Sequence, residues 1–133
     1  MKSSYFLSLD IFRQYNGNLG VVEENRTIPF SIRRCFFIYD MKTGDVRGKH
    51  AVNNEQCILL LSGECTVMVH DGKKQKEYHL SKPMEGVYVP AMLWREVCAC
   101  TPGSSIAVFS DKYYDTKDYI REFDAFLQYM NLC

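Results

Sequence analysis

Short runs of β-branched, aromatic and apolar residues, each followed by a turn signal, limit the fold of this chain more than any other feature. Asn16-Gly17, Ser62-Gly63 and Pro102-Gly103 are among the turn signals that separate these runs. Asp71-Gly72, between two runs, is a strong signal for a hairpin. Such spacing predicts an all-β sandwich or barrel. The expected strands span residues 19–23, 32–39, 46–52, 57–61, 65–70, 76–80, 87–89, 94–98 and 105–109.

The length and the charge balance of the chain exclude several classes of protein. With 133 residues, 47% of them hydrophobic, the chain is long enough for one buried core, and we expect a single domain spanning residues 1–133. The charges of sixteen basic and sixteen acidic residues cancel, so the chain has no net positive charge that would attract nucleic acid or an anionic membrane. No apolar run approaches the roughly 20 residues that span a bilayer. Because the first residues are also not typical of a secretory signal, a cytoplasmic protein is expected.

The C-terminal part of the chain changes from strand to helix periodicity. Its apolar residues fall on one face of a helix, and Asp115 or Thr116 is expected to cap that helix. We therefore predict a helix that packs on the outside of the barrel. The residues of this face are Tyr119, Ile120, Phe123, Phe126, Leu127 and Met130.

The six cysteines are expected to be reduced and structural. Cys98-Ala99-Cys100 lacks the two-residue spacing of a zinc knuckle or a thioredoxin motif. A cytoplasmic protein also lies in a compartment that keeps thiols reduced. Four of the cysteines lie in apolar, strand-like runs, where a free cysteine behaves as a small buried hydrophobe. The complete set is Cys35, Cys57, Cys65, Cys98, Cys100 and Cys133.

Two motifs place a histidine and an arginine at defined distances from glycine and proline residues. In the first, five residues separate Gly44 from His50-Ala51-Val52, three separate Val52 from Gln56, and six separate Gln56 from Gly63. In the second, the segment that begins at Pro90 places Arg95 where cupins carry their last histidine. The chain therefore resembles a cupin. The resemblance implies a jelly-roll, or double-stranded β-helix, barrel, to which the C-terminal helix is added.

The metal ligands of that family are mostly replaced in this chain. A metal-binding cupin supplies three histidines and one glutamate, whereas the matching positions here are His50, Val52, Gln56 and Arg95. Valine cannot ligate, a neutral amide is a poor substitute for a carboxylate, and arginine carries a permanent positive charge. We therefore expect no metal or other cofactor. Arg95 is instead expected to be a fixed cation in the mouth of the barrel, where an anionic or carbonyl-bearing ligand would bind.

A longer series of segments extends over about residues 9–126, namely residues 19–24, 28–34, 36–40, 47–51, 61–63, 89–96, 113–115 and 118–121. This series is similar to the WxcM-like cupin family of sugar-nucleotide 3,4-ketoisomerases. That family acts on dTDP-4-keto-6-deoxyglucose and moves the ketone from carbon 4 to carbon 3. The resemblance implies a metal-free enzyme, a dTDP-linked keto-sugar as its ligand, a homodimer, and a role in making 3-amino sugars for surface polysaccharide.

The resemblance also assigns roles to residues. His50 is expected to be the base, because an ordinary histidine pKa near 6.5 lies close to the operating pH. Tyr39 matches a pocket tyrosine of the family and is expected to supply protons to the oxygens. The family signature Arg-Gly-x-His-Ala-His ends here in Val52, which shares a strand face with His50, so one imidazole of the pocket is absent. The candidate substrate-binding residues are Arg33, Arg47, Val52, Gln56, Tyr88, Trp94 and Arg95.

Other interpretations of these residues remain open at this stage. His50 and Tyr39 also fit a barrel core, Arg33 also fits a surface or a dimer interface, and Tyr88 and Trp94 fit the core as well as they fit stacking on thymine. Two alternative functions follow. Val52 suggests a binding protein without catalysis, and a 3,5-epimerase would likewise remove a proton next to the ketone.

Overall fold

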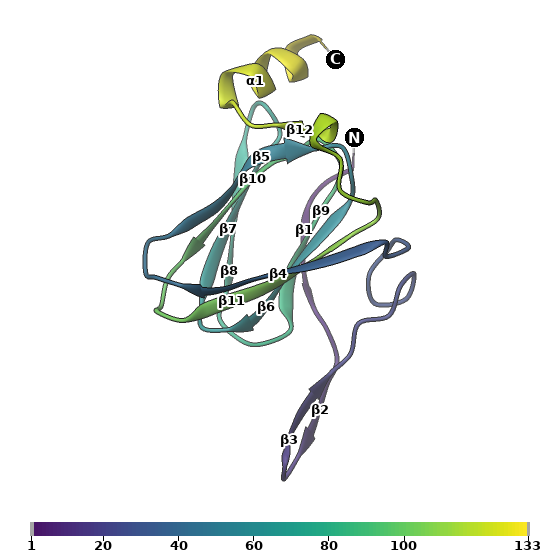
Figure 1. Ribbon diagram of the computed structural model, residues 1–133, viewed down its shortest axis with the longest axis vertical. Coiled ribbons are helices and arrows are strands. Elements are labelled where there is room, and N and C mark those ends of the chain that lie inside the picture. Colours follow the sequence, from purple (N-terminus) through teal and green to yellow (C-terminus); the bar gives the residue numbers. More distant parts are fainter. Residues whose placement is uncertain (1, 133) are drawn as a thin grey trace.

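Two five-stranded antiparallel sheets face each other and form a barrel (Figure 1). The computed structural model describes residues 2–132. The strand order is β1-β9-β6-β11-β4 in the first sheet and β12-β5-β10-β7-β8 in the second. Sequence-distant neighbours such as β4 and β11 are the crossovers expected of a jelly roll. The predicted all-β barrel with a C-terminal helix is confirmed.

The strand bounds agree with most of the expected runs. The first sheet contains β1 (Tyr5–Ser8), β4 (Arg34–Met41), β6 (Gln56–Ser62), β9 (Glu85–Val89) and β11 (Ser104–Ser110). The second contains β5 (Val46–Val52), β7 (Cys65–His70), β8 (Gln75–Leu80), β10 (Trp94–Ala99) and β12 (Tyr119–Ile120). A separate hairpin of β2 (Ile11–Gln14) and β3 (Gly17–Gly20) projects from the barrel (Figure 1).

Alternate residues of the strands fill the space between the sheets. Ile58 and Leu60 of β6 face Val67 and Val69 of β7, and all four are buried in one apolar cluster with residues of β9, β10 and β11. Burial of each such side chain contributes about 1.5–3 kcal/mol. The outer face of the first sheet has a second cluster, in which Ile28 of the loop after β3 packs on that sheet.

The C-terminal segment differs from the prediction in where its helix begins. Asp115 does cap a helical turn, accepting a hydrogen bond from the Lys117 amide at 3.0 Å, but that turn is the short 3₁₀ helix η1 (Thr116–Asp118). Tyr119–Ile120 then pairs with β5 as β12. The prediction of a helix over these residues is wrong, because the free edge of β5 offers their backbone groups hydrogen-bond partners.

The helix α1 (Phe123–Leu132) follows and packs on the outside of the second sheet, as predicted (Figure 1). Phe126 is fully buried there and lies in one cluster with Ala51 and Trp94. Within residues 2–132, no helix has the length and apolarity needed to cross a membrane.

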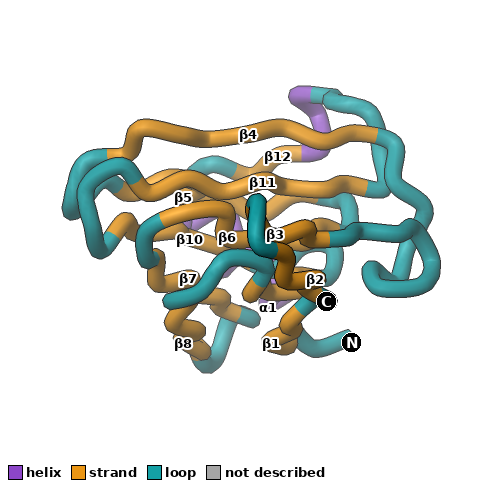
Figure 2. The backbone as a smooth tube through the Cα atoms, turned by 90° about the horizontal axis from the view of Figure 1, so that it is seen from below, coloured by secondary structure: helices purple, strands orange, loops and turns teal. Residues whose placement is uncertain are grey.

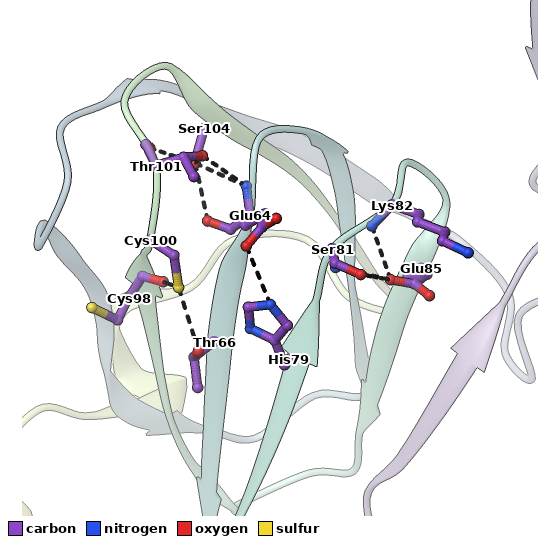
Figure 3. A network of polar contacts seen from close by, with 10 residues as sticks. All are labelled: Glu64, Thr66, His79, Ser81, Lys82, Glu85, Cys98, Cys100, Thr101 and Ser104. Atoms are coloured by element: carbon purple, nitrogen blue, oxygen red, sulfur yellow. Dashed lines mark hydrogen bonds and ion pairs between the residues drawn. The ribbon is translucent and has the colours of Figure 1, made fainter.

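A network of polar contacts joins the turns that follow β6 and β10 (Figure 3). The Glu64 amide donates to Thr101 Oγ1 at 3.0 Å, and Ser104 Oγ donates to the Glu64 carbonyl at 3.0 Å. Gly63 adopts a φ of +76°, and a Cβ there would lie 2.4 Å from Ser104 Oγ. The second glycine of the cupin motif is therefore required by its left-handed backbone conformation and by the close packing around it.

The cysteines that the structure describes are all free thiols. Burial raises the pKa of Cys57 to about 12 and that of Cys65 to about 11, so both are inert, as expected of structural cysteines. Cys35 is exposed, and the prediction that it is a buried hydrophobe is wrong because its side of β4 faces outward. Cys133 lies outside the described residues.

Candidate active site

A cavity of about 380 Å³, open to solvent at one end, lies between the two sheets. Its apolar wall comes from β4, β6, β10 and β11, and its polar residues come mainly from β5, β6, β10 and β12. The polar lining residues are Arg47, His50, Gln56, Arg95, Tyr119 and Arg121. Among the residues that line it, none is acidic, so the cavity is suited to an anionic ligand.

A bulge in β5 brings two of these residues to the cavity together. Arg95 pairs with His50, but the next residue of β10 pairs with Gly48, so Lys49 is the extra residue and has a φ of 53°. Without the bulge, Arg47 and His50 would point to opposite faces of the strand. Gly48 has a φ of +89°, and a Cβ there would lie 3.0 Å from the Arg95 carbonyl oxygen. The Arg-Gly-x-His sequence is therefore the local cause of this part of the site.

Arg95 is the most deeply buried charged group of the site, with 1% of its surface exposed. Its Nη1 donates to Gln56 Oε1 at 2.9 Å, and its Nη2 and Nε donate to the Leu93 carbonyl at 2.9 and 3.2 Å. Burial lowers its pKa to about 9, so the guanidinium is cationic at neutral pH. Within residues 2–132, no carboxylate forms an ion pair with it. A buried cation held only by neutral acceptors leaves charge for a ligand to neutralise.

His50 is half-buried beside Arg95 and is held in its neutral form. Burial lowers its pKa to about 3, and the nearby charges of Arg95, Arg121 and Arg34 lower it in the same direction. Its buried Nδ1 has no hydrogen-bond partner among the described residues. The imidazole is therefore unprotonated at neutral pH and can accept a proton. An ordinary pKa near 6.5, expected from the sequence, is not what this environment allows.

Tyr119 completes the polar side of the cavity from the edge strand β12. The edge strands β4 and β12 of the two sheets lie next to each other (Figure 2). Arg34 Nη2 on β4 donates to the Tyr119 hydroxyl at 3.1 Å, so a side-chain hydrogen bond joins the two sheets at this side. The rings of Tyr119 and His50 form a T-shaped contact with their centres 4.9 Å apart. The Arg121 guanidinium lies over the Tyr119 ring, 4.6 Å from its centre.

Comparisons with known proteins decide the family. Residues 2–131 match the family described as FdtA: WxcM-like, C-terminal. The chain belongs to this family. It is 39% identical to the TDP-4-oxo-6-deoxy-alpha-D-glucose-3,4-oxoisomerase of Aneurinibacillus thermoaerophilus over 115 residues, which are 86% of this chain and 83% of that protein. The family resemblance predicted from the sequence is confirmed.

Solved structures agree with that assignment. A 3,4-ketoisomerase from Helicobacter canadensis superposes with a TM-score of 0.92 at 31% identity, over 98% of this chain and 99% of that one. QdtA, a 3,4-ketoisomerase from Thermoanaerobacterium thermosaccharolyticum, gives 0.91 at 25% identity, over 99% and 96% of the two chains. That structure is a histidine-to-asparagine variant in complex with TDP-4-keto-6-deoxyglucose. The barrel is thus the one used by WxcM-like ketoisomerases.

The structure brings only some of the predicted site residues to the cavity between the two sheets. His50, Arg47, Gln56 and Arg95 line it together. Val52 lies opposite Tyr119 in the pairing of β5 and β12, is fully buried, and is not one of the residues that line the cavity.

Tyr39 and Arg33 lie outside the cavity, against the prediction. Tyr39 is 70% exposed on the outward face of β4, while Arg34, Phe36 and Ile38 form the inward face. Residues 33 and 39 are an even number of positions apart and so share a face of an extended segment, but this alternation does not show which face points inward. Arg33 is exposed and lies 5.9 Å from the ring centre of Tyr113.

Tyr88 and Trp94 belong to the core rather than to a base-stacking site. Tyr88 is 3% exposed and stacks on Tyr5 with the ring centres 4.9 Å apart. Its hydroxyl donates a hydrogen bond to the Glu55 carboxylate. Trp94 is also 3% exposed and packs against Phe123 of α1. Trp94 faces away from the cavity because its neighbour Arg95 faces into it.

Tyr119, Arg121 and Arg34 are residues of the site that were not predicted from the sequence. Tyr119 was assigned to a helix because its spacing from the later apolar residues fits a period of 3.6. The polar run from Asp115 to Asp118, which separates it from β11, was the available signal for a separate short element. Arg34 and Arg33 are adjacent, and nothing in the local sequence distinguishes which of them points inward.

Proposed function

We propose that this protein catalyses the 3,4-ketoisomerisation of dTDP-4-keto-6-deoxyglucose. The relatives are named 3,4-ketoisomerases and oxoisomerases, which confirms the enzyme class predicted from the sequence. The observation that carries the proposal for this chain is the neutral His50 beside a buried arginine, in a cavity without acidic lining residues. A neutral base next to a fixed cation suits the enolisation of a ketone, because the base can take the proton and the cation can stabilise the negative charge that develops on oxygen.

The charge of the cavity fits a sugar nucleotide. Arg95 and Gln56 lie at its buried end, whereas Arg47 and Arg121 are exposed. We propose that the keto-sugar enters the cavity and that the diphosphate meets the exposed arginines. Guanidinium groups bind phosphate oxygens through paired, charge-assisted hydrogen bonds.

The carbon-side proton transfer follows from this arrangement. The ketone at carbon 4 acidifies the hydrogen on carbon 3, and the neutral His50 takes that proton. The electron pair forms a carbon–carbon double bond and leaves negative charge on an oxygen, which the Arg95 guanidinium stabilises. His50 then returns the proton to carbon 4, and the ketone is left on carbon 3.

The chemistry is proposed to be metal-free. Three of the four cupin ligand positions hold Val52, Gln56 and Arg95. The amide oxygen of Gln56 already accepts a hydrogen bond from Arg95. A divalent cation placed there would lie against a guanidinium that keeps its charge at neutral pH.

The test is an NMR time course of the purified protein with dTDP-4-keto-6-deoxyglucose in heavy water. A 3-keto product is expected. Deuterium at carbons 3 and 5 with the ketone still on carbon 4 would mean a 3,5-epimerase. No label and no product, with binding retained, would mean a sugar-nucleotide-binding protein. Either of these two outcomes contradicts the proposal.

The assembly is proposed to be a homodimer. Phe37 and Tyr39 expose 59% and 70% of their surfaces on the outward face of β4, and the β2–β3 hairpin projects away from the barrel (Figure 1). Exposed apolar patches of this kind mark protein interfaces. Light scattering should give twice the chain mass of 15.5 kDa, and a monomer at all concentrations would refute the dimer. A cytoplasmic location and a role in making 3-amino sugars for surface polysaccharide complete the proposal.

A further inference from the structure

The isomerisation needs a second proton transfer that His50 does not perform. Besides the proton that moves from carbon 3 to carbon 4, one proton must leave the hydroxyl on carbon 3 and another must reach the oxygen on carbon 4. A group that serves both oxygens must give up and take back a proton. Arginine keeps its protons at neutral pH and the amide of Gln56 does not ionise. Of the residues that line the cavity, only His50 and Tyr119 are left.

The geometry points to Tyr119 as this oxygen-side catalytic residue, a role that rests on the proposed ketoisomerase activity. Its hydroxyl oxygen accepts a hydrogen bond from Arg34 Nη2 at 3.1 Å, so its own proton is free to be donated to a ligand. The Arg34 guanidinium also lies where it can balance negative charge on that oxygen after the proton leaves. The contact between the rings of Tyr119 and His50 places the two proton carriers side by side.

The steps balance as follows. His50 takes the proton of carbon 3, the bonding pair becomes the double bond between carbons 3 and 4, and the ketone oxygen becomes an enolate. Tyr119 protonates that oxygen, and the resulting phenolate removes the proton of the hydroxyl on carbon 3. A carbonyl forms at carbon 3 while the double-bond pair takes the proton back from His50 at carbon 4. Both residues end in their starting states, and no oxidant or reductant is consumed.

The β12 strand is what supplies this tyrosine. Tyr119 pairs with Val52 in the register of β5 and β12, so the phenol lies opposite the position where the family signature carries its second histidine. Tyr39, the tyrosine favoured by the sequence, is exposed on the outer face of the barrel. Tyr119 therefore takes the role that the sequence analysis assigned to Tyr39.

The experiment compares Tyr119→Phe with Tyr114→Phe in heavy water. Tyr114 is the matched control, because its ring lies 5.5 Å from that of Tyr119 but it does not line the cavity. Two quantities are followed by NMR: the rate of 3-keto product and the deuterium at carbon 3 of the remaining substrate. We expect Tyr119→Phe to lower the product rate by roughly 10²-fold or more, the usual effect of losing a general acid–base group. Deuterium at carbon 3 should rise, because His50 still forms an enolate that now lives longer.

The outcomes separate this role from the others. Product and exchange that fall together would mean that Tyr119 only positions His50, and an unchanged product rate would mean that it does neither; both results overturn the proposal. If Tyr114→Phe also lowers the product rate while deuterium at carbon 3 rises, the role is not specific to Tyr119 and the proposal is also overturned. A wild-type protein that forms no 3-keto product fails the proposed function itself, which distinguishes that failure from a wrong assignment of Tyr119. Circular dichroism and the melting temperature confirm that both variants fold.

Discussion

At the scale of single residues, the site works through charges that are not neutralised within the described part of the chain. Arg95 is buried against neutral acceptors, and His50 is kept neutral partly by the arginines around it. A ligand that brings negative charge would balance the positive charge of Arg95. It would also raise the pKa of His50, because it would stabilise the protonated imidazole. His50 is thus a base whose strength increases when negative charge develops beside it.

Replacing His50 tests that role directly. His50→Asn should lower turnover by roughly 10²–10⁴, the usual contribution of general acid–base catalysis. The fold should be retained, because the residue borders a cavity and its Nδ1 has no partner within the described chain that would be lost. Turnover is measured by NMR and folding by thermal melting. A folded variant with wild-type turnover would exclude His50 as the base.

The pH dependence of kcat/KM tests the environment of the same residue. The base must be unprotonated, and burial with nearby arginines lowers the pKa of His50 to about 3 in the free protein. We therefore expect kcat/KM to stay level from about pH 8 down to about pH 5, whereas an ordinary histidine would lose activity near 6.5. An acidic limb centred near pH 6.5 would show that the cavity does not depress this pKa.

The same shift has a consequence for stability. In the unfolded chain His50 takes up a proton below its ordinary pKa of 6.5, but in the folded cavity it does so only near 3. The free energy of unfolding should therefore fall as the pH drops from 6.5 towards 3, because the unfolded state binds more protons there. His50→Asn serves as the control and should show a shallower dependence.

At the scale of elements, most strands could be predicted, and the errors occur where the local sequence is ambiguous. The runs around Val67 and Ile106 alternate or are fully apolar, so their strands follow from the residues alone. Arg33 and Arg34 do not reveal which side of β4 faces the cavity, because that depends on pairing with β11. Tyr119 has helical spacing, but the free edge of β5 was not visible in the sequence. Arg95 and His50 followed from motif spacing, which carries tertiary information that periodicity lacks.

The packing of α1 gives a prediction at this scale. Phe126→Ala should lower the free energy of unfolding by about 3–5 kcal/mol, as expected for truncation of a buried phenylalanine. Phe126 is fully buried against the second sheet, whereas Tyr129 on the same helix is 40% exposed. Tyr129→Ala is therefore the control and should cost far less. Urea denaturation measures both values, and equal losses would mean that α1 does not pack as described.

At the scale of the whole molecule, a neutral chain separates its charges in space. Basic and acidic residues number sixteen each, yet within residues 2–132 three arginines and no carboxylate line the cavity. Composition alone predicts no anionic partner, so this preference could be predicted only from the cupin spacing that singled out Arg95. The structure places that arginine at the buried end of the cavity and not in the barrel mouth, where it was expected. The β5 bulge, in which Lys49 is the extra residue, brings Arg47 to this cluster, and β12 leads directly into Arg121. Arg34 reaches the site through its hydrogen bond to Tyr119. Each of these depends on contacts between distant segments.

This concentration of positive charge leads to the last prediction, which concerns metal. A divalent cation needs several anionic or neutral donors, and the cavity offers His50 and a Gln56 oxygen already bound to Arg95, surrounded by guanidinium groups. Coulomb repulsion from these arginines opposes a second cation more strongly than one imidazole attracts it. The protein purified without added metal should therefore contain no stoichiometric zinc, iron or manganese in elemental analysis, and EDTA should leave its turnover unchanged. One equivalent of tightly bound metal, or turnover lost to EDTA and restored by a metal, would contradict the charge argument on which the proposed mechanism depends.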